Sequence, residues 1–292
     1  MSNRFTVQKE DKLLNFLFNN LSTWSKKRVK ERLRLNSIYI NGKATTKHDF
    51  ALNVGDIVEV STPAKKPKEN NQDIKTLEIL YQDEYIIAIN KPHGLLSVAT
   101  TKENKQHALA ILRAQLSGKK RKNSIKIFPV HRLDRDTSGV LLFATSKEIR
   151  ERVMAKWEES TKIYLAIVQG KPKVPVATIN KPLRLDDKIY KVIVGEHKLA
   201  KRAVTHYKVI KSAKKSSLLE VKIDTGRQHQ IRAHLAHIGN PIVGDQRYGK
   251  KGDKLGLHAK YLKVYHPIKK CFLSVSIDAP SSFYQLLEKD SI

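Results

Sequence analysis

The sequence has 292 residues, and its 56 lysines and arginines against 28 aspartates and glutamates give a formal net charge of +28. A hydrophobic content of 40% supplies enough apolar side chain for a packed core, so the high charge does not indicate disorder. The single cysteine, Cys271, excludes an intramolecular disulfide and a zinc site built from several thiolates.

The first domain is predicted over residues 1–62, where apolar positions recur at helical spacing in two short segments. Ser25 is placed to cap the second of these helices, and Asn41-Gly42 is the strongest short signal for a β-hairpin. Two short helices with a basic face, followed by hairpins, make a compact module. The predicted elements are helices over 11–18 and 25–35, a hairpin over 37–45 and a strand over 54–60.

Residues 63–73 are polar, contain proline and offer nothing to bury, so they are predicted to form a linker. The remaining chain, residues 74–292, is rich in predicted strands. Irregularly spaced strands with few intervening helices indicate an α+β fold rather than a doubly wound parallel sheet. The predicted strands are 85–90, 140–145, 163–168, 204–210, 217–223 and 272–277, and the predicted helices are 105–116, 147–157 and 228–238.

Basic residues are spread along the chain and not confined to one end. Clusters lie at 26–34 and 119–122, and a third runs from Lys198 to Lys215. A soluble basic surface would explain one such cluster, but several together favour a groove for a polyanionic partner. Nucleic acid is the first expectation, ahead of a membrane surface, because no long amphipathic basic helix is visible.

Several classes of site and location are disfavoured by missing patterns. No apolar run approaches the roughly 20 residues that cross a bilayer, and no signal peptide is visible, so we expect a cytoplasmic protein. No long heptad pattern is present, so we expect a monomer. The sequence also lacks a glycine-rich phosphate loop and an HExxH motif.

Two features invite interpretation as a metal or nucleophile site. His229, His234 and His237 lie close together on the helix predicted over 228–238, but helix histidines more often serve packing or hydrogen bonding, so we expect no metal. Cys271 precedes a predicted strand and is expected beside the core, with no assigned histidine to activate it.

Polar and charged residues are densest at 131–139, HRLDRDTSG, directly before an apolar strand. On spacing alone, this segment predicts a loop in which Asp134 or Asp136 closes an Asx turn. Three further segments change the interpretation because each combines polar residues with a strand or a turn. They are KPHGLLSV at 91–98, KIYLA at 162–166 with Tyr164 in a strand, and TGRQHQIR at 225–232 with Arg227 in a glycine turn.

In this order, HRLDRDTSG, KPHGL, KIYLA and GRQHQIR resemble the motifs of the RluA family of pseudouridine synthases. The resemblance covers about residues 74–288 and implies a mixed or antiparallel sheet in an α+β catalytic domain. Residues 1–62 are similar to the small alpha-L RNA-binding module that often precedes this domain. Further matches are NPIVGDQRYG at 240–249, LHA at 257–259 and HP at 266–267.

The resemblance implies isomerisation of uridine to pseudouridine in RNA, a reaction without net redox change that needs no cofactor. It assigns the catalytic carboxylate to Asp134, which would stabilise or trap the electron-poor sugar centre as glycosidase carboxylates do. Two routes stay open at this point. Asp134 either attacks the sugar as a nucleophile or promotes loss of a sugar proton to give a glycal.

The resemblance also gives roles to the neighbouring residues. Arg227 matches the arginine that pairs with the catalytic aspartate, and Tyr164 matches the tyrosine that packs on the base and helps remove its carbon-5 proton. Arg132 would fill the space that a flipped uridine leaves, with His131 in a supporting role. Asp136 is expected to be a turn residue. In the first module, the basic residues expected to contact RNA are Lys26, Lys27, Arg28 and Lys30.

Rival functions remain. A non-enzymatic RNA-binding or ribosome-assembly protein would fit the basic surface, but it gains nothing from a carboxylate at Asp134. A glycosidase or base glycosylase would need a second carboxylate, and Asp136 is poorly placed for that role. The expected substrate is ribosomal large-subunit RNA first and transfer RNA second.

Overall fold

The computed structural model describes residues 3–34, 37–61, 76–100, 106–117, 126–186, 189, 191–250, 252 and 254–288. The chain divides into two compact units, Met1–Asp73 and Ile74–Ile292, which are described one at a time. The expected linker at 63–73 and the basic cluster at 119–122 lie outside the described residues.

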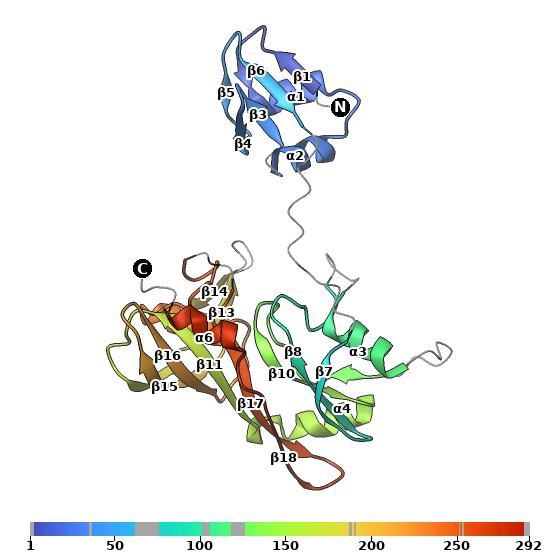
Figure 1. Cartoon of the computed structure of the whole chain (residues 1–292), viewed down its shortest axis with the longest axis vertical. Helices are drawn as coiled ribbons and strands as arrows, with labels where there is room; N and C mark the ends of the chain where they lie inside the picture. The colour runs from blue at the N-terminus through green and yellow to red at the C-terminus, as the bar shows by residue number, and fades with distance from the viewer. Residues whose placement is uncertain are drawn as a thin grey trace. The chain divides into compact units, whose positions relative to one another are not determined.

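The first unit contains a four-stranded sheet and two helices around one apolar core (Figure 1). Leu17 of the first helix, Val29 of the second and Val58 of the sheet are all fully buried in this core. The elements are β1 (Asn3–Thr6), β2 (Asp11–Lys12), α1 (Leu13–Asn20), α2 (Lys26–Arg34), β3 (Ile38–Ile40), β4 (Lys43–Thr45), β5 (Ala51–Leu52) and β6 (Ile57–Val60). The sheet order is β1-β6-β3-β4, and β2 pairs with β5.

Two local predictions for this unit are confirmed. Asn41 and Gly42 both have positive φ, 49° and 79°, in the turn between β3 and β4, as a two-residue hairpin of this hand requires. The Oγ of Ser25 accepts a hydrogen bond of 3.3 Å from the backbone N–H of Arg28, so Ser25 caps α2.

The second unit is built on a ten-stranded mixed sheet with the order β12-β15-β16-β11-β17-β10-β8-β7, while β18 pairs with β17 and β9 with β10. Among the strands that the structure describes in this sheet, every pair is antiparallel except β10 with β17, which confirms the expected α+β fold with a mixed sheet. The strands are β7 (Glu78–Gln82), β8 (Ile86–Lys91), β9 (Phe128–Pro129), β10 (Ser138–Ala144), β11 (Thr161–Gln169), β12 (Val176–Asn180), β15 (Val204–Ser212), β16 (Ser216–Ile223), β17 (Leu257–His266) and β18 (Cys271–Ser276). A separate hairpin is formed by β13 (Leu183–Asp186) and β14 (Lys191–Val194).

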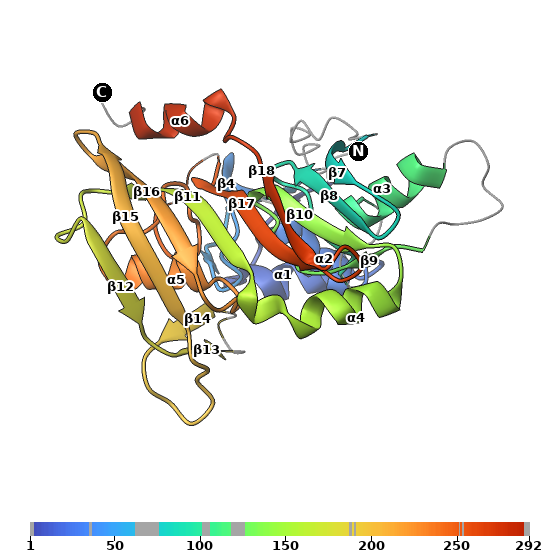
Figure 2. The same cartoon turned by 90° about the horizontal axis from the view of Figure 1, so that it is seen from below.

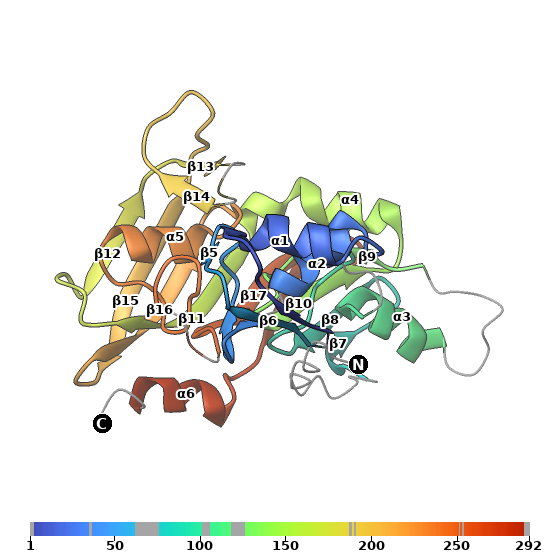
Figure 3. The ribbon, with the colours of Figure 1, turned by 90° about the horizontal axis from the view of Figure 1, so that it is seen from above.

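One half of the sheet is covered on both faces by helices α3 (Ala108–Ser117) and α4 (Lys147–Ala155). Because successive side chains of a strand point to opposite faces, Ile87 and Phe143 join the core with α3, whereas Ala88 and Leu142 join the core with α4. Figures 2 and 3 show α3 and α4 on opposite sides of β8 and β10. Burial on both faces explains why these strands are continuous apolar runs.

The other half is built in the same way around β11 and β16. Ala166 and Val168 of β11 pack in a core with α5 (Gln230–His237), and the alternate residues Leu165 and Ile167 pack in a core with α6 (Ser281–Glu288). The two halves meet at β17, which pairs with β11 on one side and β10 on the other (Figure 1).

The junction between the halves is narrow, because β10 and β17 pair through only two positions, Ser138 with His258 and Gly139 with Ala259. Gly139 has φ +110°, and a Cβ at this position would lie 2.2 Å from the carbonyl oxygen of Ala259. Only glycine allows this approach. The last residue of HRLDRDTSG therefore joins the two halves directly after the loop that carries Asp134.

Two further findings concern the expectations from sequence. Cys271 is exposed and does not lie beside the core, because β18 buries only Val275 among its side chains. Within the described residues, no helix is both long and apolar enough to cross a membrane.

Candidate active site

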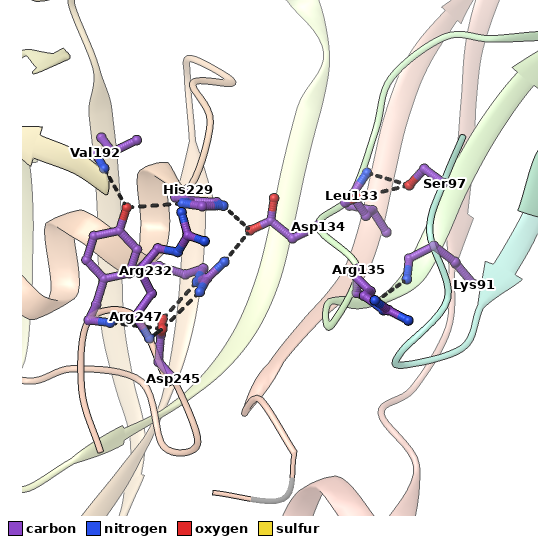
Figure 4. A network of polar contacts seen from close by, with 11 residues as sticks. Lys91, Ser97, Leu133, Asp134, Arg135, Val192, His229, Arg232, Asp245 and Arg247 are labelled. Carbon is purple, nitrogen blue, oxygen red and sulfur yellow. Dashed lines mark hydrogen bonds and ion pairs between the residues drawn. The ribbon is translucent and has the colours of Figure 1, made fainter. Parts of the chain in front are cut away.

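Asp134 lies in the loop 131–137 between β9 and β10, and a second loop holds this one in place. The Oγ of Ser97 accepts a hydrogen bond from the backbone N–H of Leu133 and donates one to its carbonyl oxygen, at 3.0 and 2.8 Å. The Nζ of Lys91 donates to the carbonyl oxygen of Arg135 at 2.9 Å. Both supporting side chains come from KPHGLLSV, so this segment fixes the backbone on either side of Asp134 (Figure 4).

Lys91 is fully buried at the end of β8. Its Nζ also donates to the carbonyl oxygens of Pro92 and Leu95, at 2.9 and 2.6 Å, and these three acceptors match the three N–H bonds of an ammonium group. Burial lowers the pKa of Lys91 to about 7, although the charges of Asp136 and Asp134 oppose that shift.

This pKa predicts how Lys91 contributes to stability as a function of pH. Between about pH 7 and its ordinary value of 10.5, an unfolded chain keeps the proton that buried Lys91 has released. Because the unfolded state then binds more protons, the free energy of unfolding should rise with pH, by at most about 1.4 kcal/mol per pH unit. We expect Lys91→Met to remove this rise. Urea titrations of both proteins at pH 7 and pH 9.5 give the free energy of unfolding at each pH. An equal change in this free energy between the two pH values in both proteins would contradict the expectation.

Asp134 is paired with Arg232, which lies in α5 on the other half of the sheet. The Nη1 of Arg232 donates to Oδ2 of Asp134 at 2.9 Å, while its Nε and Nη2 donate to the two carboxylate oxygens of Asp245, at 2.8 and 2.9 Å. Arg232 therefore bridges two carboxylates, and its link to Asp134 crosses between the halves (Figure 4).

The charges in this chain of contacts stabilise one another. Burial alone would raise the pKa of Asp245, but Arg232 and the backbone N–H groups of Arg247 and Tyr248 hold it below its usual value. Burial would likewise lower the pKa of Arg232, yet Asp245 and Asp134 raise it above its usual range. Arg232 is therefore a permanent cation beside Asp134.

Arg227 does not make the expected pair with Asp134. Its side chain is exposed, its Nε donates to the carbonyl oxygen of Arg202 at 3.1 Å, and its backbone N–H donates to Oε1 of Gln230. The reason is its position: Arg227 lies in the turn before α5, whereas Arg232 lies inside the helix. The expectation from sequence selected the correct segment, TGRQHQIR, but the wrong arginine of the two.

Tyr164 lies in β11 where the register with β17 shifts, between Ile163 and Tyr164. Its ring packs against the cores of both halves. Burial raises the pKa of Tyr164 well above its usual range, and the charge of Asp134 adds to the effect. At neutral pH this shift favours the phenol form of the side chain, which can pack against a base or form hydrogen bonds.

His229 also faces Asp134, and sequence reasoning considered it only as a metal ligand. Its Nε2 lies 3.7 Å from Oδ2 of Asp134, and its Nδ1 lies 3.1 Å from the hydroxyl of Tyr248. Its backbone has φ +51°, a conformation that non-glycine residues seldom adopt and that is often associated with functional sites. The sequence feature that could have identified His229 as a site residue is its position between Arg227 and Arg232.

The two other residues predicted in the loop differ in exposure. Arg132 is exposed beside Asp134. The Nε2 of His131 instead accepts a hydrogen bond of 3.2 Å from the backbone N–H of Leu142, and its ring packs against Trp157. Burial, together with the charge of Lys162, lowers the pKa of His131 to about 4. His131 is thus a neutral side chain that anchors the loop, and its predicted supporting role in RNA contact stays a prediction.

The remaining predicted residues lie in the first unit and are described apart from Asp134. The guanidinium of Arg28 lies 4.0 Å from the centre of the Trp24 ring, and Nζ of Lys26 lies 5.8 Å from that of Phe18. The exposed basic residues of α2 expected to contact RNA are Lys26, Lys27, Arg28 and Lys30.

The buried histidine of α5, His234, is engaged in hydrogen bonds. Both ring nitrogens of buried His234 have partners, the hydroxyl of Thr205 at 2.8 Å and the carbonyl oxygen of Lys181 at 2.9 Å. In the described part of the chain, no group of three or more histidine, cysteine or acidic side chains is arranged to hold a metal ion.

Comparisons with known proteins agree with this geometry. A family model described as RNA pseudouridylate synthase matches residues 85–237. The chain is 34% identical to "tRNA pseudouridine synthase C" of Vibrio vulnificus over 73% of this chain and 95% of that protein. It is 32% identical to "Ribosomal large subunit pseudouridine synthase D" of Buchnera aphidicola, over 97% of this chain and 94% of that protein. The solved structure of human RNA Pseudouridylate Synthase Domain Containing 4 superposes with a TM-score of 0.59 at 25% identity, over 73% of this chain and 92% of that one.

Proposed function

Because the chain belongs to the RNA pseudouridylate synthase family, it isomerises uridine to pseudouridine in RNA, and we propose that Asp134 is the catalytic carboxylate. The observation that supports this role most directly is the pairing of Asp134 with Arg232, which holds the carboxyl group of Asp134 at the junction of the two halves.

The reaction breaks the bond between N1 of uracil and the anomeric carbon, turns the base, and joins its C5 to the same carbon. Within the described residues, the hydrogen bond from Arg232 and the ion pairs with Arg232 and His229 all reach Oδ2 of Asp134. Oδ1 is therefore the oxygen available for the sugar (Figure 4). It either bonds to the anomeric carbon, in an ester that breaks when C5 bonds to that carbon, or assists loss of the neighbouring sugar proton, which returns when C5 bonds. The proton released from C5 at the end goes to water, and N1 takes up one proton from water.

A uridine inside structured RNA must leave its stack to reach Asp134. We assign Arg132 to the vacated space, because its exposed side chain is two residues away in the same loop. The neutral ring of Tyr164 would pack against the uracil once it is flipped.

We propose large-subunit ribosomal RNA as the substrate. The match to the relative named for ribosomal RNA covers 97% of this chain. The match to the relative named for transfer RNA covers only 73% of this chain, although it covers 95% of that relative. The second match leaves a portion of this chain without a counterpart, about the size of the first unit. Transfer RNA is the alternative, supported by the 34% identity to that relative.

A direct assay separates the two substrates. RNA made with uridine tritiated at C5 loses tritium to water whenever a uridine is isomerised. We expect release from large-subunit ribosomal RNA and little from transfer RNA. Release from transfer RNA alone would select the alternative, and release from neither would contradict the proposed activity.

The first unit is proposed to hold the RNA through the basic face of α2. Deleting residues 1–62 should weaken RNA binding and make the slope of log affinity against log salt shallower, by about 0.9 for each duplex phosphate that the protein no longer neutralises. Maximum turnover at saturating RNA should change much less, since Asp134 and Arg232 both lie in the second unit.

A finer variant tests the same surface without deletion. Lys26→Gln, Lys27→Gln and Lys30→Gln together should reproduce much of the change in salt slope. The matched control is Lys43→Gln with Lys47→Gln, which removes exposed charges from the same unit outside α2. Unchanged affinity and slope in the deletion protein would show that the first unit does not hold RNA.

We further propose that the enzyme acts in the cytoplasm, where ribosomal RNA is available to it, and that it acts as a monomer. Size-exclusion chromatography with light scattering measures the oligomeric state.

A further inference from the structure

The segment NPIVGDQRYG, at 240–249, supplies two supports for the active site. Asp245 holds Arg232 through two hydrogen bonds, as described above. Tyr248 contacts His229, the second group that faces Asp134. The role of Tyr248 follows from the direction of the hydrogen bonds around its hydroxyl.

The Tyr248 hydroxyl has two hydrogen-bond partners, a backbone N–H group and a histidine ring nitrogen. The backbone N–H of Val192, in β14, donates to the hydroxyl oxygen at 2.9 Å. A backbone N–H can only donate, so the phenolic proton is left for the other neighbour, Nδ1 of His229 at 3.1 Å. The Nδ1 of His229 is then an acceptor, and in a neutral imidazole the proton resides on Nε2.

This tautomer suits the carboxylate. An Nε2–H group directed at Oδ2 of Asp134 is attractive, whereas the other tautomer would direct a nitrogen lone pair at the negative oxygen. The separation of 3.7 Å is longer than a hydrogen bond, and such contacts commonly tighten when substrate is bound. Burial lowers the pKa of His229, with Arg232 and Arg247 lowering it further against the effect of Asp134, so the ring is neutral at neutral pH.

We propose that Tyr248 is a positioning residue, which holds His229 in the tautomer that presents Nε2–H to Oδ2 of Asp134 and so leaves Oδ1 to the substrate. Its catalytic part rests on the proposed role of Asp134, but the tautomer itself does not. Tyr248 in turn depends on the β13–β14 hairpin, because it packs against Leu183 and Val192 and its hydroxyl accepts from the backbone N–H of Val192.

The tautomer can be measured directly by NMR of the full-length protein labelled with ¹⁵N-histidine. The nitrogen shifts of His229, assigned by their loss in His229→Gln, should show the Nε2–H form in the wild type. In Tyr248→Phe the phenolic donor is gone, and we expect the Nδ1–H form to become populated. A wild-type His229 with its proton on Nδ1, or an unchanged tautomer in Tyr248→Phe, would overturn the proposal.

Kinetics test the consequence. Tyr248→Phe keeps the ring and should lower kcat about tenfold, the effect of losing one hydrogen bond to a charged group, while KM for RNA stays within about twofold. Glutamine at position 229 carries a side-chain N–H that needs no tautomer, so Tyr248→Phe should have little further effect in the His229→Gln background. The control is Tyr207→Phe, which loses a hydroxyl bonded to the carbonyl oxygen of Val174 but does not contact His229.

The outcomes separate this inference from the proposed function. Wild-type kcat in Tyr248→Phe, or effects of the two substitutions that simply add, would contradict the positioning role. If Asp134→Asn is active, the assignment of Asp134 fails instead, whatever tautomer His229 has. Thermal melting of each variant identifies any loss of activity that comes from unfolding.

Discussion

Asp134→Asn is expected to abolish isomerisation, with turnover lower by at least about a thousandfold, as for other residues that act directly on the reacting atoms. The amide keeps the shape of the carboxylate but has neither its charge nor its nucleophilic oxygen. It can neither bond to the anomeric carbon nor stabilise its developing positive charge. RNA affinity should remain within a few-fold of the wild type, because most of the binding energy comes from phosphate contacts elsewhere.

Single-turnover release of tritium from C5-labelled RNA measures this effect, and filter binding measures affinity in parallel. The matched control is Asp136→Asn, an exposed carboxylate two residues away in the same loop, which should stay within a few-fold of wild-type turnover. Comparable losses in both variants would show that the loop needs its total negative charge and not the particular carboxylate of Asp134.

Arg232→Met should have the second largest effect, on both activity and stability. It removes the cation from Asp134 and leaves the carboxylate of Asp245 fully buried without its partner. Leaving one member of a buried ion pair alone typically costs about 3–5 kcal/mol of folding free energy. We expect turnover to be lost and the free energy of unfolding to fall by about that amount in urea titrations.

A double variant separates the two effects. Arg232→Met with Asp245→Asn no longer buries an unpaired charge, so part of the stability should return, but activity should not. Arg227→Ala is the control, because this exposed arginine contacts neither carboxylate; its unfolding free energy should change by less than about 0.5 kcal/mol. If the double variant regains both stability and turnover, the pairing of Arg232 with Asp134 is not needed for catalysis.

The sequence predicted most of the central strands because their patterns are strong. The run 140–145 is apolar throughout, as strands buried on both faces are, and it corresponds to β10. By contrast, β17 was not predicted, although it joins the two halves. Half-buried lysines and tyrosines are interspersed with buried residues over LHAKYLKVYH, and the only features recognised there from sequence were the LHA and HP motifs. The strand thus looks half polar, and only its pairing with β10, β11 and β18 shows why it is central.

The candidate site was predicted in part. The segments 91–98, 131–139 and 225–232 do come together, but sequence spacing could not distinguish Arg227 from Arg232. That choice depends on where α5 begins, and helix boundaries are the least certain part of a prediction from sequence. Asp245 and Tyr248 could not be assigned roles for a different reason. They support the site through Arg232 and His229, so their contribution appears only once the side chains are placed.

We propose that this chain converts uridines of large-subunit ribosomal RNA to pseudouridine through Asp134. The most direct test of this proposal is a map of pseudouridine in the ribosomal and transfer RNA of cells that lack the gene, complemented with wild-type protein or with Asp134→Asn. We expect that one or more large-subunit positions lose pseudouridine, that the wild type restores them, and that Asp134→Asn does not. Restoration of those positions by Asp134→Asn, or an unchanged map without the gene, would contradict the proposal.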